Sequence, residues 1–421
     1  MSLVKTSLLN GIAVVSKVAS ALVLNKILAF YVGPAGYAVI GQFQNAISIV
    51  VSLAGGVVAT GVTKTTAQYF DDETKQHAIW KTAIRFSLGA SLIAAIGLLF
   101  ISDSLAQWLL NRKDMSDIFF WLALTLPAMA ANNLMMAIVN GKKEVGIYVL
   151  LNIIGSFISM LVTGILAFNF GLHGALIAFT INPAIMLLST AAIVARRDWI
   201  KVKFLWGPIS RPALRELSGF GLMALTSALT IPITFTLIRN NLSASLGLTA
   251  AGYWQASWKI SEIYLMLVTT TLSVYYLPRL AEIKKASELK SEMIKVYRFV
   301  MPIVIGGAVL IFMLRDFIIN TLFTQNFLPM RELFPWQLAG DVIKIGSWII
   351  SYVMLGRAMI KVFMITEIAF SISFILFSRL FIDLYGLVGV AMAYSTNYLL
   401  YWIVMLIMVK KEMRNMELKR V

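Results

Sequence analysis

Eight charged residues inside long apolar stretches stand out in this 421-residue chain. Each stretch is long enough to cross a bilayer, where a charged side chain costs about 2.5–3.5 kcal/mol to insert. A charge at that depth needs an ionic partner or a water-filled cavity, so these residues are candidates for binding or carrying an ion. They are Lys17, Lys26, Arg239, Lys259, Glu262, Asp341, Lys344 and Glu367.

Four of the basic residues are predicted to bind an anionic substrate group: Lys17, Lys26, Arg239 and Lys259. Lys17 lies roughly ten residues into its stretch, too deep for its ammonium to reach the membrane surface easily. Lys26 and Arg239 lie within about two turns of an outer helix end, so snorkelling to the surface is the alternative reading. Lys17 and Lys26 fall on opposite faces of a straight helix, so a kink or a wide cavity is needed for both to line one site.

The other candidates are expected to form ion pairs or to carry a coupling ion. Lys259 with Glu262, and Asp341 with Lys344, are spaced three residues apart, which places each pair on one helix face. Each is either a static ion pair that lowers the insertion cost or part of a cluster that opens when an anionic substrate arrives. Glu367 has no cation close in sequence and is either a satisfied core acid or a proton carrier. Because basic groups outnumber acids at this depth, phosphate or pyrophosphate suits the interior better than a cationic drug.

Twelve apolar helices are predicted to position these side chains. The chain is 59% hydrophobic and 13% charged, far more apolar than a soluble protein. The first stretch follows a lone Lys5 without a small-residue cleavage site, so it is expected to remain as the first span. The spans are expected at about residues 7–32, 37–63, 78–101, 116–139, 146–168, 171–195, 217–243, 250–277, 297–318, 333–356, 358–382 and 386–409.

The basic residues of the loops predict the orientation. With the N-terminus in the cytoplasm, 24 Lys and Arg fall on the inner side, and only Arg112, Lys113 and Arg331 fall on the outer side. This asymmetry predicts a multi-pass membrane protein with both termini cytoplasmic. It also accounts for the net charge of +16 without nucleic acid as a partner.

The two halves of the chain resemble each other at an offset near 215 residues. Ala35-Gly36-Tyr37 recurs as Ala251-Gly252-Tyr253, Arg85-Phe86 with Asp103 recurs as Arg298-Phe299 with Asp316, and Phe170-Gly171-Leu172-x-Gly174 with Asn182 recurs as Tyr385-Gly386-Leu387-x-Gly389 with Asn397. Six spans in each half make the repeat parallel, and transporters built in this way bind substrate between two halves that rock against each other. The expected organisation is a six-helix bundle over 1–200, a cytoplasmic basic linker over 201–216, a second six-helix bundle over 217–409 and a basic cytoplasmic tail over 410–421.

Other classes of function fit less well. No Walker-type loop occurs, and His77 and His173 stand near loops on opposite sides, so neither a nucleotide, a metal nor another cofactor is expected. An enzyme of polysaccharide assembly would need a large outer loop or a carboxylate motif for metal, and a drug exporter would need an excess of cavity acids. A channel is disfavoured by the two-half repeat. Aromatic residues near span ends are expected to form an interfacial belt: Tyr253, Trp254, Trp258, Tyr275 and Tyr276.

Several segments resemble the Wzx-type O-antigen translocases of enteric bacteria, which belong to the multidrug, oligosaccharidyl-lipid and polysaccharide exporter superfamily. They are Met1-Ser2-Leu3-Val4-Lys5-Thr6-Ser7, Gly33-Pro34-Ala35-Gly36, Gly61-Val62-Thr63-Lys64, Tyr275-Tyr276-Leu277-Pro278, Leu314-Arg315-Asp316-Phe317 and Phe334-Pro335-Trp336-Gln337-Leu338-Ala339-Gly340-Asp341-Val342-Ile343-Lys344. The resemblance implies an all-α membrane protein of two six-helix bundles in a V, with helices one, two, seven and eight lining a central cavity.

The implied cargo is an undecaprenyl-pyrophosphate-linked oligosaccharide that crosses to the periplasmic leaflet. Proton or sodium coupling and contacts with other polysaccharide assembly proteins are further expectations. One branch of the family moves the enterobacterial common antigen unit. That branch has a basic residue at the position of Gln44 and Asp at the position of Glu262. Because this chain differs, an O-antigen unit is the preferred cargo and the common antigen unit is the alternative. A drug exporter of the same fold is the remaining alternative.

Overall fold

The computed structural model describes residues 3–110, 112–283, 285–357 and 359–418, and these ranges form helices and short turns without a strand. The core of a bilayer offers no water to backbone N–H and C=O groups, so a long apolar segment satisfies them within a helix. Among the described residues, eight helices are long and apolar enough to cross a membrane. Met1 and Ser2 lie outside the described residues, as do three of the 24 basic residues assigned to the inner side, Lys284, Lys419 and Arg420.

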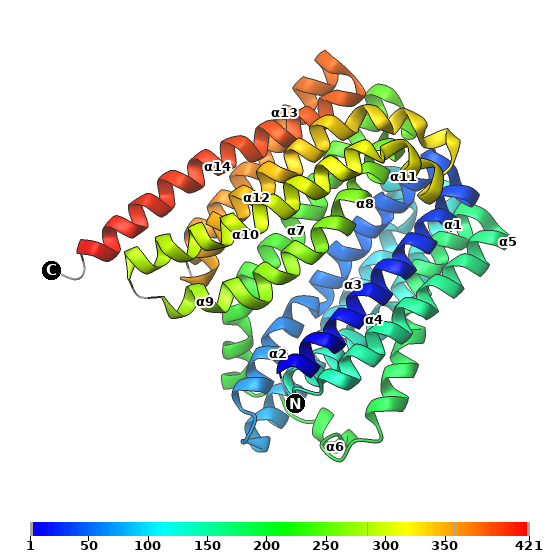
Figure 1. The fold of residues 1–421 in the computed structure, drawn as a ribbon. Helices are drawn as coiled ribbons and strands as arrows, with labels where there is room; N and C mark the ends of the chain where they lie inside the picture. The colour runs from blue at the N-terminus through cyan, green and yellow to red at the C-terminus, as the bar shows by residue number, and fades with distance from the viewer. Residues whose placement is uncertain (1–2, 111, 284, 358, 419–421) are drawn as a thin grey trace. The chain divides into compact units, whose positions relative to one another are not determined.

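The first of two compact units consists of Met1–Val32 and Val39–Thr236. Its helices are α1 (Leu3–Val51), α2 (Val57–Gln68), α3 (Glu73–Leu105), α4 (Ser116–Gly141), α5 (Val145–Val194), the short α6 (Val202–Leu205) and α7 (Arg211–Leu246) as far as Thr236. α4 packs against both α3 and α5 (Figure 1). Buried Val62, Trp80 and Ile138 join α2, α3 and α4, and Leu217 of α7 packs on the same cluster.

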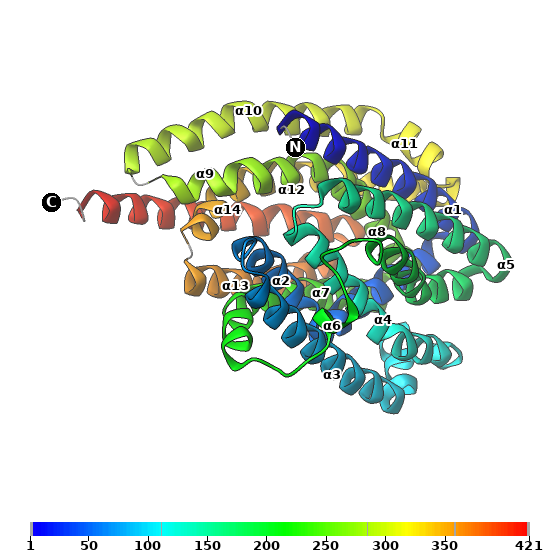
Figure 2. The ribbon, with the colours of Figure 1, turned by 90° about the horizontal axis from the view of Figure 1, so that it is seen from below.

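The second unit consists of Gly33–Ala38 and Leu237–Val421. Its helices are the rest of α7, α8 (Leu248–Thr271), α9 (Leu277–Glu282), α10 (Ala286–Met313), α11 (Arg315–Leu322), α12 (Phe334–Gly356), α13 (Ile360–Tyr385) and α14 (Leu387–Leu418). Figures 1 and 2 show α10, α12 and α14 running side by side, with α12 in contact with both neighbours. Buried Tyr276, Ile349, Val353 and Met405 lie in the core of this layer.

Irregular turns interrupt several of the helices. π-helical turns occur at Ser52–Gly56, before α2, and at Leu272–Tyr276, before α9. A third follows α3 at Ala106–Leu110, and short 3-10 helices occupy Lys113–Met115 and Gln325–Leu333. Such π-helical turns bend a helix locally.

Two glycine turns separate consecutive helical runs with the same geometry. Gly171 in the middle of α5 has φ 56° and ψ −133°, and Gly386 between α13 and α14 has φ 62° and ψ −138°. Positive φ is readily adopted only by glycine. Three residues later, a Cβ at Gly174 or Gly389 would lie 2.0 Å or 1.9 Å from a backbone carbonyl oxygen of the preceding helix. The glycines that the sequence repeat paired therefore form matching tight turns.

Large apolar side chains cover the outside of the long helices. On α3, Ile93 is 74% exposed and Phe100 is 86% exposed, while Leu188 on α5 and Ile365 on α13 are also well exposed. A soluble monomer rarely shows such extended apolar surface. These helices therefore face lipid, and the chain is a multi-pass membrane protein.

Candidate functional site

A buried carboxylate is the centre of the polar interior of the second unit. Asp341 on α12 is fully buried and accepts hydrogen bonds from three hydroxyl groups. Ser261 Oγ and Tyr264 OH, both on α8, donate to its Oδ2 over 2.6 and 3.0 Å, and Tyr394 OH on α14 donates to its Oδ1 over 2.9 Å. Bonds to a charged acceptor are the strong class of hydrogen bond, and three of them offset much of the cost of burying the carboxylate.

An aromatic cage surrounds the neighbouring lysine. Lys344 lies one helical turn after Asp341 on α12, and its Nζ is 4.9 Å from the ring centre of Trp258 and 4.8 Å from that of Trp348. The rings of Tyr394 and Tyr398 lie 5.9 and 5.6 Å away. The expected direct pair of Asp341 with Lys344 does not occur among the salt bridges of the described chain. The carboxylate is held by hydroxyls and the ammonium by π-faces, whose negative potential attracts a cation.

The other predicted pair does form. Lys259 Nζ lies 2.8 Å from Glu262 Oε2, with 30% and 49% of the two side chains exposed. Trp258 Nε1 donates to Glu262 Oε1 over 3.1 Å, and the ring of Trp258 also faces Lys344. Trp258 thus joins the exposed pair to the buried cluster. The structure brings together Lys259, Glu262, Asp341 and Lys344 in one unit.

Four other candidates remain. Arg239 on α7 is buried, donates a hydrogen bond to Gln255 Oε1 and lies over the ring of Trp254. This burial does not fit a side chain that snorkels to the membrane surface. Lys17 is exposed and Lys26 half-buried, both on α1 in the first unit, and Glu367 is half-buried on α13.

Helical periodicity explains why these residues meet. Gln337, Asp341 and Lys344 follow one another at i, i+4 and i+7, so they share one face of α12. Ser261 and Tyr264 share a face of α8 in the same way. Gln337 Nε2 donates to Ser261 Oγ over 3.2 Å, and no described group bonds the buried Gln337 Oε1. The cluster therefore offers a carboxylate and an additional amide oxygen in a dry setting, which suits a proton or one small monovalent cation.

Sequence reasoning missed most of the partners in this cluster. Ser261, Tyr264 and Tyr394 had no signal of their own, because their contacts with Asp341 join residues from separate helices. The expected aromatic belt was wrong for two residues: Trp254 and Tyr276 are fully buried inside the protein rather than at a lipid interface. The spacing of polar residues along α12 was the one signal that could have found the cluster.

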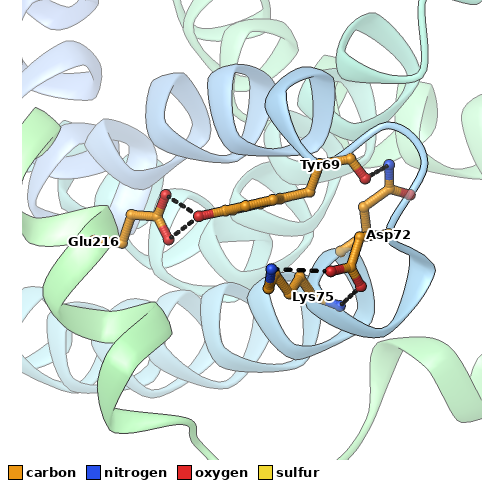
Figure 3. Close-up of polar contacts among 5 residues, drawn as sticks. Tyr69, Asp72, Lys75 and Glu216 are labelled. Carbon is orange, nitrogen blue, oxygen red and sulfur yellow. Dashed lines mark hydrogen bonds and ion pairs between the residues drawn. The ribbon is translucent and has the colours of Figure 1, made fainter.

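A second polar group ties α7 to the end of α2 in the first unit (Figure 3). Tyr69 OH donates to Glu216 of α7, with distances of 3.1 and 3.3 Å to the two carboxylate oxygens. This bond raises the pKa of Tyr69, because the neighbouring carboxylate disfavours the phenolate. Gln76 Nε2 donates to the carbonyl oxygens of Thr66 and Tyr69, which satisfies the open C-terminal end of α2.

Asp72 caps the start of α3 beside this contact. Its Oδ1 accepts from the backbone N–H of Lys75 over 3.0 Å, and its Oδ2 lies 3.1 Å from Lys75 Nζ. These two interactions hold the pKa of Asp72 below its ordinary value. The cap fixes where α3 begins and so where the α2–α3 turn presents Tyr69 to Glu216.

Solved structures with this architecture are transporters. A multidrug-resistance transporter of the MATE family, in the MOP superfamily and in its inward-facing conformation, aligns with a TM-score of 0.79 and 16% identity over 95% of each chain. A MOP superfamily transporter from Pyrococcus furiosus, described as having a binding pocket of reversed polarity, aligns with a TM-score of 0.67 and 16% identity over 96% of each chain. At this identity the likeness establishes the fold alone.

Sequence relatives are more informative about function. The lipid III flippase of Escherichia coli (strain K12) is 30% identical over 402 residues, covering 96% of this chain and 97% of that protein. A Shigella flexneri protein whose name assigns it provisionally to O-antigen transport is 22% identical over 95% of this chain and 96% of its own. The profile of a family described as "Polysaccharide biosynthesis protein" matches residues 16–332. The relatives found here are named as a flippase and a transporter rather than as enzymes. The chain therefore belongs to this polysaccharide biosynthesis family, and it has the fold of the MOP superfamily.

Proposed function

We propose that this protein is a flippase that moves an undecaprenyl-pyrophosphate-linked oligosaccharide from the cytoplasmic to the periplasmic leaflet of the bacterial inner membrane by alternating access. The observation that carries the proposal is the 30% identity with a lipid III flippase over nearly the whole of both chains. The fold alone is compatible with many cargoes, including drugs. Family membership supports a lipid-linked substrate.

The proposed architecture has twelve spans in two parallel six-helix bundles, over 1–200 and 217–409, joined by the basic linker and followed by a basic tail. α1 is 49 residues long and α5 is 50, and each has a glycine turn inside it, at Gly33 and at Gly171, so each is long enough for two crossings. Positive φ angles recur at Gly247 and Gly386, close to the offset of the sequence repeat. The basic loops favour cytoplasmic termini.

The cargo head is proposed to bind through Lys17, Lys26, Arg239 and Lys259. Lys259 has the best structural support, because its ammonium is partly exposed and is held by Glu262 alone among the described acids. A pyrophosphate carries more negative charge than one carboxylate, so it would compete for this ammonium. Release of Glu262 would then loosen its bond to Trp258, which also covers Lys344.

Asp341 is the proposed carrier of a coupling ion, and Glu262, Lys344 and Glu367 are the other coupling and ion-pair candidates in the second unit. Asp341 is held by three hydroxyls, one of which also accepts from Gln337, whose amide oxygen has no partner among the described residues. Such a carboxylate can exchange a proton or a sodium ion when the surrounding helices shift. Among the described residues, no three His, Cys, Asp or Glu side chains gather into one group, so a divalent ion is disfavoured. Movement of Lys344 toward Asp341 would expel the ion.

The O-antigen repeat unit is the first candidate cargo, because Gln44 and Glu262 depart from the pattern that the common antigen branch shows. The common antigen unit is the second candidate, favoured by the higher identity with the lipid III flippase. The two candidates share the lipid pyrophosphate and differ only in the sugar head.

Complementation in two strains separates these cargoes. One strain lacks its O-unit translocase and the other lacks its lipid III flippase, and each receives the chain at protein levels matched by immunoblot. Restored surface polysaccharide in one strain alone assigns the cargo to that strain's glycan. If neither strain regains its polysaccharide although the protein reaches the membrane, the proposed function is wrong for both units.

A further inference from the structure

The linker between α5 and α7 lies along one face of α3. Phe204 of α6 stacks on His77 at a centroid distance of 3.9 Å, and the backbone N–H of Ser210 donates to Thr82 Oγ1 over 3.0 Å. Between these contacts, a Cβ at Gly207 would lie 2.7 Å from Lys81 Cδ, so the linker backbone rests on the aliphatic part of that lysine. The guanidinium of Arg85 lies 5.2 Å from the ring centre of Trp206.

Two cations of α3 meet the linker at this place. Lys81 and Arg85 are four residues apart and therefore share one face of α3. Both side chains are half-buried, and neither forms a salt bridge with an acidic residue of the described chain. Trp206 lies beside them with 59% of its surface exposed. The result is a small surface with two positive charges and one exposed indole ring.

Spacing along α3 places this surface at the edge of the hydrocarbon. The next charged residue after Arg85 is Asp103, eighteen residues later, which corresponds to about 27 Å of helix and is close to the hydrocarbon thickness. Side chains on a helix tilt toward its N-terminus, so Lys81 and Arg85 reach back toward the end of α3 that carries the basic loops. Trp is the residue most suited to the level of the headgroups.

We propose that Lys81, Arg85 and Trp206 form a binding site for the phosphate of an anionic phospholipid at the membrane surface. The two cations contact the headgroup phosphate, and the indole ring of Trp206 packs beside the glycerol and upper acyl chains. A polyprenyl phosphate offers the same chemistry, but the phospholipids of the leaflet are in large excess and occupy a surface site by mass action. An occupied site anchors the linker to α3 and to the leaflet together.

Trp206 itself reports on the site in the full-length protein in lipid nanodiscs. The fluorescence of the W206F variant is subtracted from that of the wild type, and quenching is compared between brominated phosphatidylglycerol and brominated phosphatidylcholine. We expect phosphatidylglycerol to be preferred by about fivefold for each cation. The double variant K81Q/R85Q should bring this preference close to one, and R298Q, which removes the repeat counterpart of Arg85, should leave it unchanged.

Three results would overturn the proposal: equal quenching by the two lipids, an equal effect of R298Q, or displacement by undecaprenyl phosphate at a mole fraction far below that of phosphatidylglycerol. The last result would assign the site to the lipid carrier instead. If K81Q/R85Q does not fold, the salt dependence of the wild type decides, because a charge-based preference must fall as ionic strength rises.

Discussion

Tyr394→Phe removes one hydroxyl from the buried cluster and leaves the rest of the side chain in place. The Tyr394 OH donates to Asp341 Oδ1, while Ser261 and Tyr264 donate to Oδ2 and are unchanged in the variant. The ring, which lies 5.1 Å from the ring of Trp258 and 5.9 Å from Lys344 Nζ, keeps its contacts. The variant therefore isolates the contribution of a single donor to a buried carboxylate.

We expect a loss of about 1.5 kcal/mol in the free energy of unfolding. Hydrogen bonds to charged groups contribute about 1.5–3 kcal/mol in soluble proteins, whereas polar contacts within membrane proteins reach about 1.7 kcal/mol at most. Asp341 is fully buried in the folded state, so the loss of unfolding free energy should lie near the upper end of the range for membrane proteins. Asp341→Asn weakens the same bond by removing the charge of its acceptor.

Reversible unfolding of the purified protein in mixed micelles measures these changes, with Tyr385→Phe as the control. Tyr385 is 55% exposed at the end of α13, so its hydroxyl should contribute less than about 0.5 kcal/mol. A double-mutant cycle of Tyr394→Phe with Asp341→Asn should give a coupling of about 1 kcal/mol. The reasoning is refuted if Tyr394→Phe behaves like the control and the coupling is zero.

Three further predictions concern the turns, the binding lysines and the α3 cap. Gly389→Ala and Gly174→Ala should each destabilise the protein by about 3 kcal/mol or more, because the new Cβ meets a carbonyl oxygen. Gly306→Ala should not, because its Cβ meets nothing within 4 Å, and equal thermal stability of the three variants would contradict this reasoning. Lys259→Gln and Lys17→Gln should lower surface polysaccharide at normal protein levels. Lys259→Gln should change the free energy of unfolding by less than about 1 kcal/mol, because its ion pair is partly exposed. Undiminished polysaccharide would show that these lysines do not bind cargo. Because the pKa of Asp72 is lowered, its cap contributes stability above the unfolded-state pKa and loses it as pH falls through the folded-state pKa. The protection of the Lys75 amide against hydrogen exchange should therefore fall at acidic pH in the wild type but not in Asp72→Asn. A protection factor that does not depend on pH argues against the cap.

The all-helical character of the chain followed from the sequence because lipid leaves few choices. Long apolar runs must become helices, and the glycine motifs that recur around Gly171 and Gly386 adopt the same backbone angles. Lys259 and Glu262 form the ion pair that their spacing on one face of α8 predicts. These features depend only on neighbours in the chain.

The contacts of Asp341 could not be predicted in this way. Spacing along α12 brings Lys344 close to Asp341. However, three hydroxyls from α8 and α14 donate to the carboxylate, and four aromatic rings surround the ammonium. Which helices face α12 is decided by packing over the whole unit. The same holds for Tyr69 and Glu216, which are 147 residues apart.

Proteoliposomes can show whether this protein moves a lipid-linked oligosaccharide across a bilayer. Purified protein is reconstituted with an undecaprenyl-pyrophosphate-linked glycan carrying a fluorescent label, and the fraction bleached by an impermeant reductant is followed over time. We predict that label starting in the inner leaflet becomes accessible in vesicles that contain the protein, and that Lys259→Gln slows its appearance. Label that stays protected in vesicles containing folded protein, with the O-antigen unit and with the common antigen unit alike, would contradict the account.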